Sequence, residues 1–174
     1  MSRPDRVAIV PYDPGWPERF DAERRQLEQT LAPWLEGGVH HIGSTAVPGL
    51  AAKPTIDMMA GVRDLVEARA AFGALAELSY VSSPHRPGIA HHFDKTTADA
   101  AFGLHLTEPE SDLWRERLAF RDALRADPLL AADYEALKLR LALEHPRDVK
   151  GYTAGKRAFV AGVLAERGIP LGRR

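Results

Sequence analysis

Apolar positions in the first two thirds of the chain change their spacing several times, which predicts short strands separated by helices. Alternating or continuous apolar runs predict strands at residues 6–12, 39–42, 55–62, 89–95 and 101–107, with one more near Tyr80. Only a turn-rich stretch with room for one helical turn separates the strands at 39–42 and 55–62. These two strands are therefore expected to pair.

Two helices interrupt the predicted strands. Pro17 is expected to open the first helix, and Pro33 with the Gly37–Gly38 pair to end it. The second is expected to begin at residues 64–67, where "DLVE" resembles a capping box. The apolar stripes are Phe20, Leu27, Leu31 and Trp34 in the first helix and Leu65, Phe72, Leu75 and Leu78 in the second.

After Pro109 the pattern is helical throughout. Asp127 and Pro128 are expected to cap and open one helix that Pro146 closes, and Asp148 to cap a last helix that ends near Gly168. Such helices must lay their apolar stripes on the sheet or on one another. We therefore expect an α/β (α+β) fold, a mixed sheet with flanking helices and a C-terminal helical segment, in a single domain over residues 1–174.

Composition narrows the classes of function. A hydrophobic content of 45% and a charged content of 27% are typical of a soluble globular protein, and no apolar run is long enough to span a membrane. The start of the chain does not resemble a secretion signal, so we expect a cytoplasmic protein. A net charge of −1 argues against bulk binding of nucleic acid, and the absence of cysteine excludes disulfides and thiolate metal sites.

Candidate chemistry is concentrated at residues 40–57, "HHIGSTAVPGLAAKPTID". Gly43 lets the backbone approach a ligand closely, and the Ser44 hydroxyl with the amides that follow, from Thr45 on, would suit phosphate oxygens. Asp57 is expected on a strand beside this turn, where its carboxylate would bind Mg²⁺ that carries the same phosphates. The alternative is a tight corner whose glycine provides a positive φ and an aspartate paired with Lys53 or an arginine.

The sequence resembles the GrpB family of bacterial proteins. The resemblance rests on "HIGSTAVPGLAAKPTIDMM" at residues 41–59, on "HHFDK" and "LHLTE" in the middle, and on "FRDALRADPLLAADYEALKLRLA" and "YTAGKRAFV" near the end. It implies a nucleotidyltransferase-like fold, in which a Gly-Ser turn precedes a strand bearing an acidic metal-binding pair. A related domain is fused to dephospho-coenzyme A kinase in some bacteria, which suggests a coenzyme A precursor as a ligand.

The sequence departs from the nucleotidyltransferase pattern at the acidic pair. That chemistry needs two carboxylates two residues apart on one strand face, but the neighbours of Asp57 at this spacing are Thr55 and Met59. Asp94 and Glu108 are the candidates for a further acidic group, and the sequence does not define their positions. The chain also has Gly103 two residues before His105, where the family often has another histidine.

Histidines suggest a competing class of enzyme. His41, His92 and His105 each lie near a predicted strand, and three converging imidazoles would make a site for Zn²⁺ or another transition metal. Alternatively they form hydrogen bonds at a polar end of the sheet. In a third interpretation, which fits the family better, His41 and His105 donate to a bound phosphate or sugar.

Cationic residues could neutralise a polyanionic ligand. Arg121 suits bidentate phosphate recognition, and Tyr152 could contact a base or sugar. For each lysine the alternative is a solvated helix face. The lysines in this group are Lys53, Lys95, Lys138 and Lys156.

Three functional hypotheses follow. The first is a Mg²⁺-dependent nucleotide-binding protein that transfers a nucleotidyl group to a small molecule or protein, with Asp57 as metal ligand and catalytic residue. The second is an accessory module that binds a nucleotide or coenzyme A precursor without chemistry, and the third a histidine-ligated metal hydrolase. Walker, dinucleotide-fingerprint and nucleophile-elbow motifs are absent. The site hypothesis predicts that His41, Asp57 and His105 surround one concave pocket.

Overall fold

A computed structural model describes residues 7–83 and 88–172. Its centre is a five-stranded sheet with the strand order β1-β2-β5-β4-β3. The central strands β2 and β5 run parallel, and the other neighbours are antiparallel. The strands are β1 (Leu35–Ile42), β2 (Thr55–Val62), β3 (Val81–Ser82), β4 (His91–Thr96) and β5 (Ala101–Thr107).

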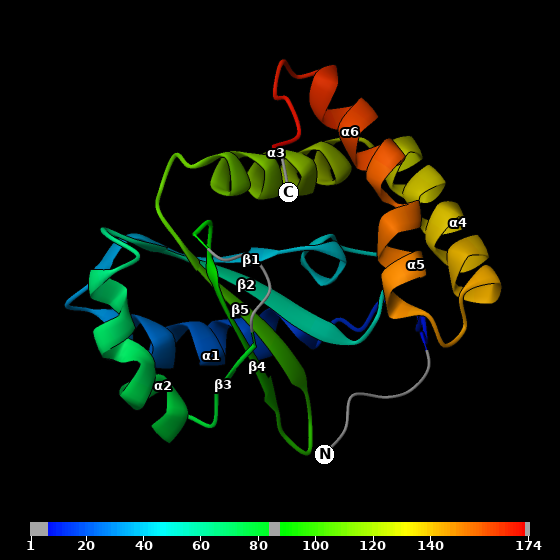
Figure 1. The fold of residues 1–174 in the computed structure, drawn as a ribbon. Helices are drawn as coiled ribbons and strands as arrows, with labels where there is room; N and C mark the ends of the chain where they lie inside the picture. Colours follow the sequence, from blue (N-terminus) through cyan, green and yellow to red (C-terminus); the bar gives the residue numbers. More distant parts are fainter. Residues whose placement is uncertain (1–6, 84–87, 173–174) are drawn as a thin grey trace.

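Helices cover both faces of the sheet (Figure 1). The helix α1 (Trp16–Leu31) lies on one face together with the 3₁₀ helix η2 (Glu67–Ala71) and α2 (Phe72–Glu77). The helix α3 (Asp112–Ala126) crosses the other face. The remaining helices gather at one end of the sheet and are α4 (Pro128–Glu144), α5 (Val149–Gly155) and α6 (Arg157–Ala165).

The central strand β2 is covered on both sides, and the alternation of its side chains decides what each face receives. Ile56, Met58 and Ala60 belong to the large core under α1. The intervening residues point to the α3 face, where Met59 packs with Trp114. Asp57 shares this second face, so its carboxylate lies between the sheet and the C-terminal helices.

Several predicted elements are confirmed. The strands at 55–62 and 101–107 have the predicted bounds, and the first of them pairs with β1 as expected. One helical turn, η1 (Ser44–Ala46), lies in the connection between β1 and β2. Asp127 caps α4, because its carboxylate accepts hydrogen bonds from the amides of Leu129 and Leu130.

The strand predicted at residues 6–12 is wrong. Arg6 lies outside the described residues, and Val10 forms only an isolated bridge with Ala52. The Val7 amide donates instead to Pro146, at the end of α4. Pro11 and Pro14 lack the amide hydrogens that a longer ladder would need, so this segment crosses the molecule without joining the sheet.

The Gly37–Gly38 pair does not lie between a helix and a strand as predicted but inside β1, at an irregularity of its register. Gly38 has a φ of 75°. A Cβ at Gly37 would lie 2.6 Å from the ring of Trp114. The absence of this side chain lets α3 approach the sheet closely.

Two predicted helices are broken. The segment from Asp64 begins as the 3₁₀ helix η2 and becomes α-helical only at Phe72. The predicted last helix divides at Lys156 into α5 and α6. Gly151 and Gly155 weaken the α-helix there, and periodicity alone does not reveal such a break.

Within the two described ranges, no helix combines the length and the apolar character that a membrane crossing would need.

Candidate functional site

The Gly-Ser turn is built around Gly43. This residue ends β1 with a φ of 73°, a conformation that favours glycine. A Cβ there would also lie 3.0 Å from Oδ2 of Asp57. Glycine is therefore required both by the backbone of the turn and by the carboxylate beside it.

Thr45 holds the turn in place and does not face a ligand. Its buried hydroxyl donates to the carbonyl of Thr55 at 3.2 Å and lies 2.9 Å from Nε2 of His41. These contacts fasten η1 to β1 and to the start of β2. Ser44 lies near the buried Tyr134 of α4, and its hydroxyl acts to lower the pKa of that phenol against the larger, opposite effect of burial.

Asp57 occupies a space left by two glycines. Its strand neighbours are Ile42 on β1 and Gly103 on β5. A Cβ at Gly103 would lie 2.7 Å from Oδ1 of Asp57, just as one at Gly43 would crowd Oδ2. Any side chain at position 103 would therefore crowd the carboxylate of Asp57.

Cations surround this carboxylate. Burial raises the pKa of Asp57, and Arg117, Lys53, His92 and Lys156 act against that shift. Two lysines and one arginine thus act electrostatically on one carboxylate, so the surroundings of Asp57 carry an excess of positive charge. An anion is the ligand that such an arrangement stabilises.

Arg117 was missed by the sequence analysis. It lies on α3 and its Nε is buried without a hydrogen-bond partner among the residues that the structure describes. An available signal was its position three residues after Trp114 on the sheet-facing side of a helix, where a cation is unexpected.

Two acidic residues were considered as partners of Asp57, and the structure separates them. Asp94 pairs with Gly103 across β4 and β5, so it lies in the same row of the sheet two strands from Asp57. Its carboxylate accepts a hydrogen bond from Ser83 at 3.0 Å. Glu108 follows the end of β5, where it accepts from the Leu65 amide instead.

Of the three histidines, only two come together. His92 and His105 are cross-strand neighbours whose ring centroids are 4.5 Å apart, on the same face as Asp57. His41 lies on the opposite face, with its ring stacked 4.7 Å from Phe20 of α1. The predicted convergence of His41, Asp57 and His105 is therefore wrong, because the side chains of His41 and Asp57 point to opposite sides of the sheet.

The geometry does not support a histidine-ligated metal hydrolase. Across residues 7–83 and 88–172, no group of three or more histidine and carboxylate side chains is arranged to hold a metal ion. Burial, with help from Arg125 and Arg121, lowers the pKa of His41 to about 4. This histidine is a neutral core residue.

Lys95 is also on the wrong face for a ligand role. Its ammonium group forms a buried ion pair with Glu23 of α1 at 2.7 Å and lies over the rings of Tyr80 and Phe102. Tyr80 donates a hydrogen bond to the same carboxylate. Lys95 therefore fastens β4 to α1.

Arg121 and Lys138 support the site through the backbone. Arg121 donates to the carbonyl of His41 at 3.1 Å, which holds α3 against the end of β1. Lys138 is buried, donates to the carbonyl of Ala51, and has its pKa lowered to about 8, chiefly by burial. Glu135 accepts from the amide of the same Ala51, so α4 grips the chain just before Lys53.

Tyr152 does not present its ring to a ligand. It is buried with Val7 and Leu141, and the ammonium group of Lys156 lies 4.4 Å from its ring centroid. The sequence-predicted residues that the structure brings together are accordingly Gly43, Ser44, Lys53, Asp57 and Lys156. His105 shares their face of the sheet but pairs with Met59.

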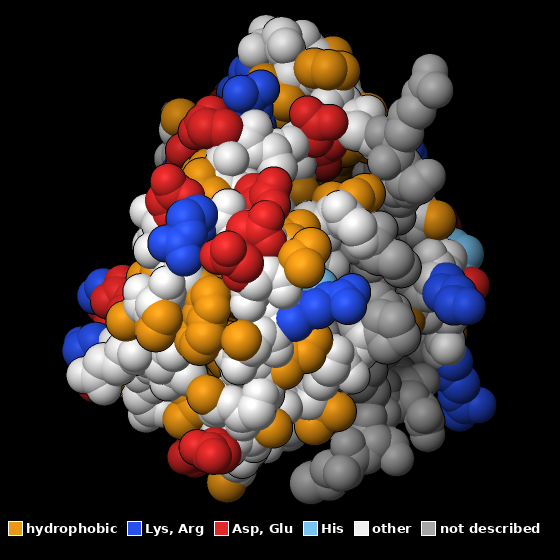
Figure 2. Space-filling model, turned by 60° about the vertical axis from the view of Figure 1, so that its left-hand side comes forward, with side chains coloured by type: hydrophobic (Ala, Val, Ile, Leu, Met, Phe, Trp, Pro, Cys, Tyr) orange, Lys and Arg blue, Asp and Glu red, His pale blue; other side chains and the backbone are white. Residues whose placement is uncertain are grey.

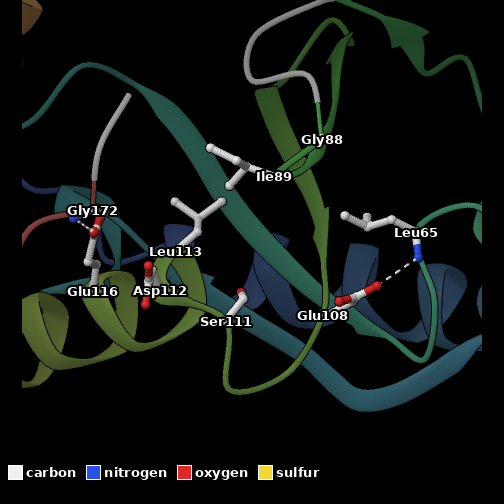
Figure 3. Close-up of a pocket in the computed structure, with 9 residues that line it drawn as sticks. All are labelled: Leu65, Gly88, Ile89, Glu108, Ser111, Asp112, Leu113, Glu116 and Gly172. Atoms are coloured by element: carbon white, nitrogen blue, oxygen red, sulfur yellow. Dashed lines mark hydrogen bonds between the residues drawn. The ribbon is translucent and has the colours of Figure 1, made fainter.

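A separate cavity lies at the other end of α3. It has a volume of about 210 Å³ and lies between the residues after β2, Ile89 and the start of α3 (Figure 3). Glu108, Asp112 and Glu116 line it, and Glu116 accepts a hydrogen bond from the Gly172 amide. On the face that Figure 2 shows, acidic side chains lie close together among basic and hydrophobic ones. The charge of the cavity disfavours phosphates.

Several bacterial proteins have a similar sequence. The chain is 33% identical to the glutamate-rich protein GrpB of Alkalihalophilus pseudofirmus, over 92% of this chain and 95% of that one. It is 35% identical to the UPF0157 protein YqkA of Bacillus subtilis over 89% of its length, but spans only 45% of that longer protein. A dephospho-CoA kinase of Mycolicibacterium paratuberculosis is 29% identical over 86% of this chain and 43% of the kinase.

Solved structures confirm the fold. A Cid1 poly(U) polymerase has a TM-score of 0.55 at 14% identity, with 84% of this chain and 49% of the polymerase covered. At this identity the likeness shows a shared fold, a mixed sheet with flanking helices as expected from the sequence.

The conserved protein GrpB from Enterococcus faecalis is a much nearer structural match. Its TM-score is 0.82 at 30% identity, with 91% of this chain and 96% of that one covered. A model of the GrpB protein family matches residues 6–166, which include the Gly-Ser turn, Asp57 and α3 to α6. Sequence and architecture agree over nearly the whole chain, which therefore belongs to the GrpB family.

Proposed function

We propose that this chain binds a nucleotide or another phosphorylated small molecule at the carboxylate of Asp57. The observation that carries the proposal is the excess of positive charge there, since Lys53, Arg117 and Lys156 act on a single carboxylate. The buried Nε of Arg117, which has no hydrogen-bond partner among the described residues, supports a ligand that accepts hydrogen bonds. A phosphate group meets both requirements.

Mg²⁺ fits this site only in one way. Mg²⁺ prefers oxygen ligands and commonly keeps several waters, so one carboxylate is enough when phosphates supply further oxygens. Thr55 and Met59, which share the strand face of Asp57, are not acidic. Asp94 is two strands away, roughly 10 Å at the usual strand spacing. We infer that a metal ion arrives with the phosphates and that Asp57 is its protein ligand.

The same reasoning favours ligand binding without catalysis over nucleotidyl transfer. Nucleotidyl transfer to a small molecule or protein would need a second carboxylate at the metal, and Asp94 would have to move to supply it. Binding without transfer needs only the residues already in place. The dephospho-CoA kinase relative, in which this chain corresponds to less than half of the protein, supports an accessory role and a coenzyme A precursor among the ligands to test.

Isothermal titration calorimetry tests the proposal. ATP, UTP and dephospho-coenzyme A are titrated into the chain with Mg²⁺ and again with a chelator. We expect binding that Arg117→Gln weakens about tenfold or more, since a charged hydrogen bond to phosphate is lost. Arg63→Gln is the matched control, because Arg63 is an exposed arginine whose side chain is 61% accessible and lies outside the site.

The outcome separates the alternatives. Heat with any of these ligands that Arg117→Gln removes and Arg63→Gln retains would support the site. Release of pyrophosphate during the titration with ATP or UTP would indicate nucleotidyl transfer in addition to binding. No heat with all three ligands, or equal effects of the two substitutions, would refute phosphate binding at Asp57.

A further inference from the structure

The helix α4 carries two apolar stripes, and only one of them is used inside the molecule. The inner stripe packs against α3, α5 and the turn region, with Tyr134, Lys138 and Leu141 buried. The outer stripe faces solvent. Its members are Leu129, Ala132, Ala136, Leu139 and Leu143.

Exposure of the outer stripe is high for residues of this type. The accessible fraction is 80% for Leu129, 45% for Leu139 and 83% for Leu143. Ala132 and Ala136 between them are exposed as well. In a helix with one partner face, such positions are normally polar.

The spacing of the stripe follows a heptad repeat. Successive members are three, four, three and four residues apart, which is the a and d pattern of a helix-pair seam. A narrow seam of this kind suits one further helix, whereas the inner stripe of the same helix is broader and serves the core.

We propose that the outer stripe of α4 binds the same stripe of a second copy of this chain, with the two helices antiparallel. An antiparallel pair places an a position opposite a d position in every layer. Ala132 then meets the partner's Leu143, and Ala136 meets the partner's Leu139, with the same two contacts repeated by symmetry. Each layer combines one small and one large side chain.

A parallel pair would fit poorly. It would put Ala132 and Ala136 against their own equivalents, which leaves gaps at that end of the seam, whereas only Leu139 and Leu143 would form well-filled layers. The residue that a parallel pair would set against Arg140 is Glu135, and Glu135 is already bound to the Ala51 amide at 2.6 Å. The antiparallel arrangement avoids both problems.

Charges beside the seam are complementary in the antiparallel arrangement. Asp133 and Arg140 are exposed, seven residues apart, and follow equivalent positions of the stripe. In an antiparallel pair, flanking heptad positions of the same type face each other across the seam. Asp133 therefore faces the partner's Arg140, and Arg140 faces the partner's Asp133. A self-complementary surface of this sort is what a twofold-symmetric dimer requires, and it identifies a second copy as the occupant.

Sedimentation equilibrium measures the association. A seam of four layers is smaller than the interface of an obligate dimer, so we expect a dimer that dissociates on dilution, with a Kd on the order of 10 µM. Ala136→Glu puts a carboxylate into the seam and should abolish the dimer. Val66→Glu and Val81→Glu are controls, since these valines are 74% and 68% accessible but lie outside α4. Circular dichroism verifies that each variant is folded.

Charge exchange tests the orientation. Asp133→Arg alone and Arg140→Asp alone should each raise the Kd about tenfold, because each creates two like-charge contacts. The double variant Asp133→Arg/Arg140→Asp should restore the affinity of the unchanged chain. A monomer at concentrations up to about 500 µM, far above that Kd, would overturn the proposal. So would a dimer that survives Ala136→Glu, or a double variant that stays as weak as the single ones.

Discussion

Asp57 and Gly103 are direct neighbours on the parallel strands β2 and β5, and a Cβ at Gly103 would come within 2.7 Å of Oδ1 of the carboxylate. The acidic side chain thus occupies the space that a neighbouring side chain would fill. Gly43 leaves a similar space at Oδ2. The position of the carboxylate therefore depends on the absence of side chains at Gly43 and Gly103. The proposed ligand site depends on this small clearance.

Gly103→Ala should displace the Asp57 carboxylate. Inserting a methyl group into a packed interior commonly costs about 1–3 kcal/mol of unfolding free energy. We expect a loss in that range by urea denaturation, together with weaker binding of the phosphorylated ligand. Gly73→Ala is the control, because a Cβ there has nothing within 4 Å and should leave stability equal or raised by about 0.5–1 kcal/mol. Equal effects of the two substitutions would contradict this account.

Asp57→Asn should change how the site responds to metal. Removing the negative charge takes away the repulsion between Asp57 and the phosphates while the cations Lys53, Arg117 and Lys156 stay, so affinity for metal-free ATP should rise, by about tenfold. Mg²⁺ should no longer strengthen binding. Calorimetry with and without a chelator measures both effects, and Asp99→Asn at an exposed position provides the control. Retained dependence on Mg²⁺ would show that Asp57 is not the metal ligand.

Lys95→Met should be strongly destabilising although the site lies on the other face of the sheet. The substitution leaves Glu23 buried without its cation, and breaking a buried ion pair from one side typically costs about 3–5 kcal/mol. The double variant Glu23→Gln/Lys95→Met removes the unpaired charge and should recover most of the loss. Chemical denaturation measures both. A single variant as stable as the unchanged chain would show that the pair contributes nothing.

His41 should make the protein less stable in mild acid. Its pKa is lowered from 6.5 to about 4, mainly by burial, so the unfolded chain binds a proton that the folded chain does not accept. Above pH 6.5 the neutral His41 does not reduce the free energy of unfolding, and this free energy decreases as the pH falls from 6.5 towards 4. A shift of this size corresponds to at most about 3 kcal/mol. Unfolding free energies of the unchanged chain and of His41→Gln, measured across this range, should show the steeper acid loss only in the former.

Whether a residue of the candidate site could be predicted depends on how far it lies from Asp57 along the sequence. Gly43, Ser44 and Asp57 could be recognised because they are close in sequence and their spacing resembles a known turn and strand. Lys156 could be proposed as a ligand-binding cation on the strength of the family resemblance. Arg117 was not recognised, because it reaches Asp57 through the crossing of α3 over the sheet. His41 was placed with Asp57 incorrectly, since the face to which a strand residue points depends on where the strand ends and how it is paired.

By itself, the sequence determined the family resemblance, the mixed α/β class, the bounds of β2 and β5, and the Gly-Ser turn beside Asp57. These depend on local spacing, on residues with restricted backbones and on short-range pattern. Only the tertiary structure decided that Lys95 belongs to the core, that Arg117 lies near Asp57, and that α4 keeps a second apolar stripe at the surface. Each of these depends on which elements pack together, and long-range packing is not encoded in the spacing of residues within one element.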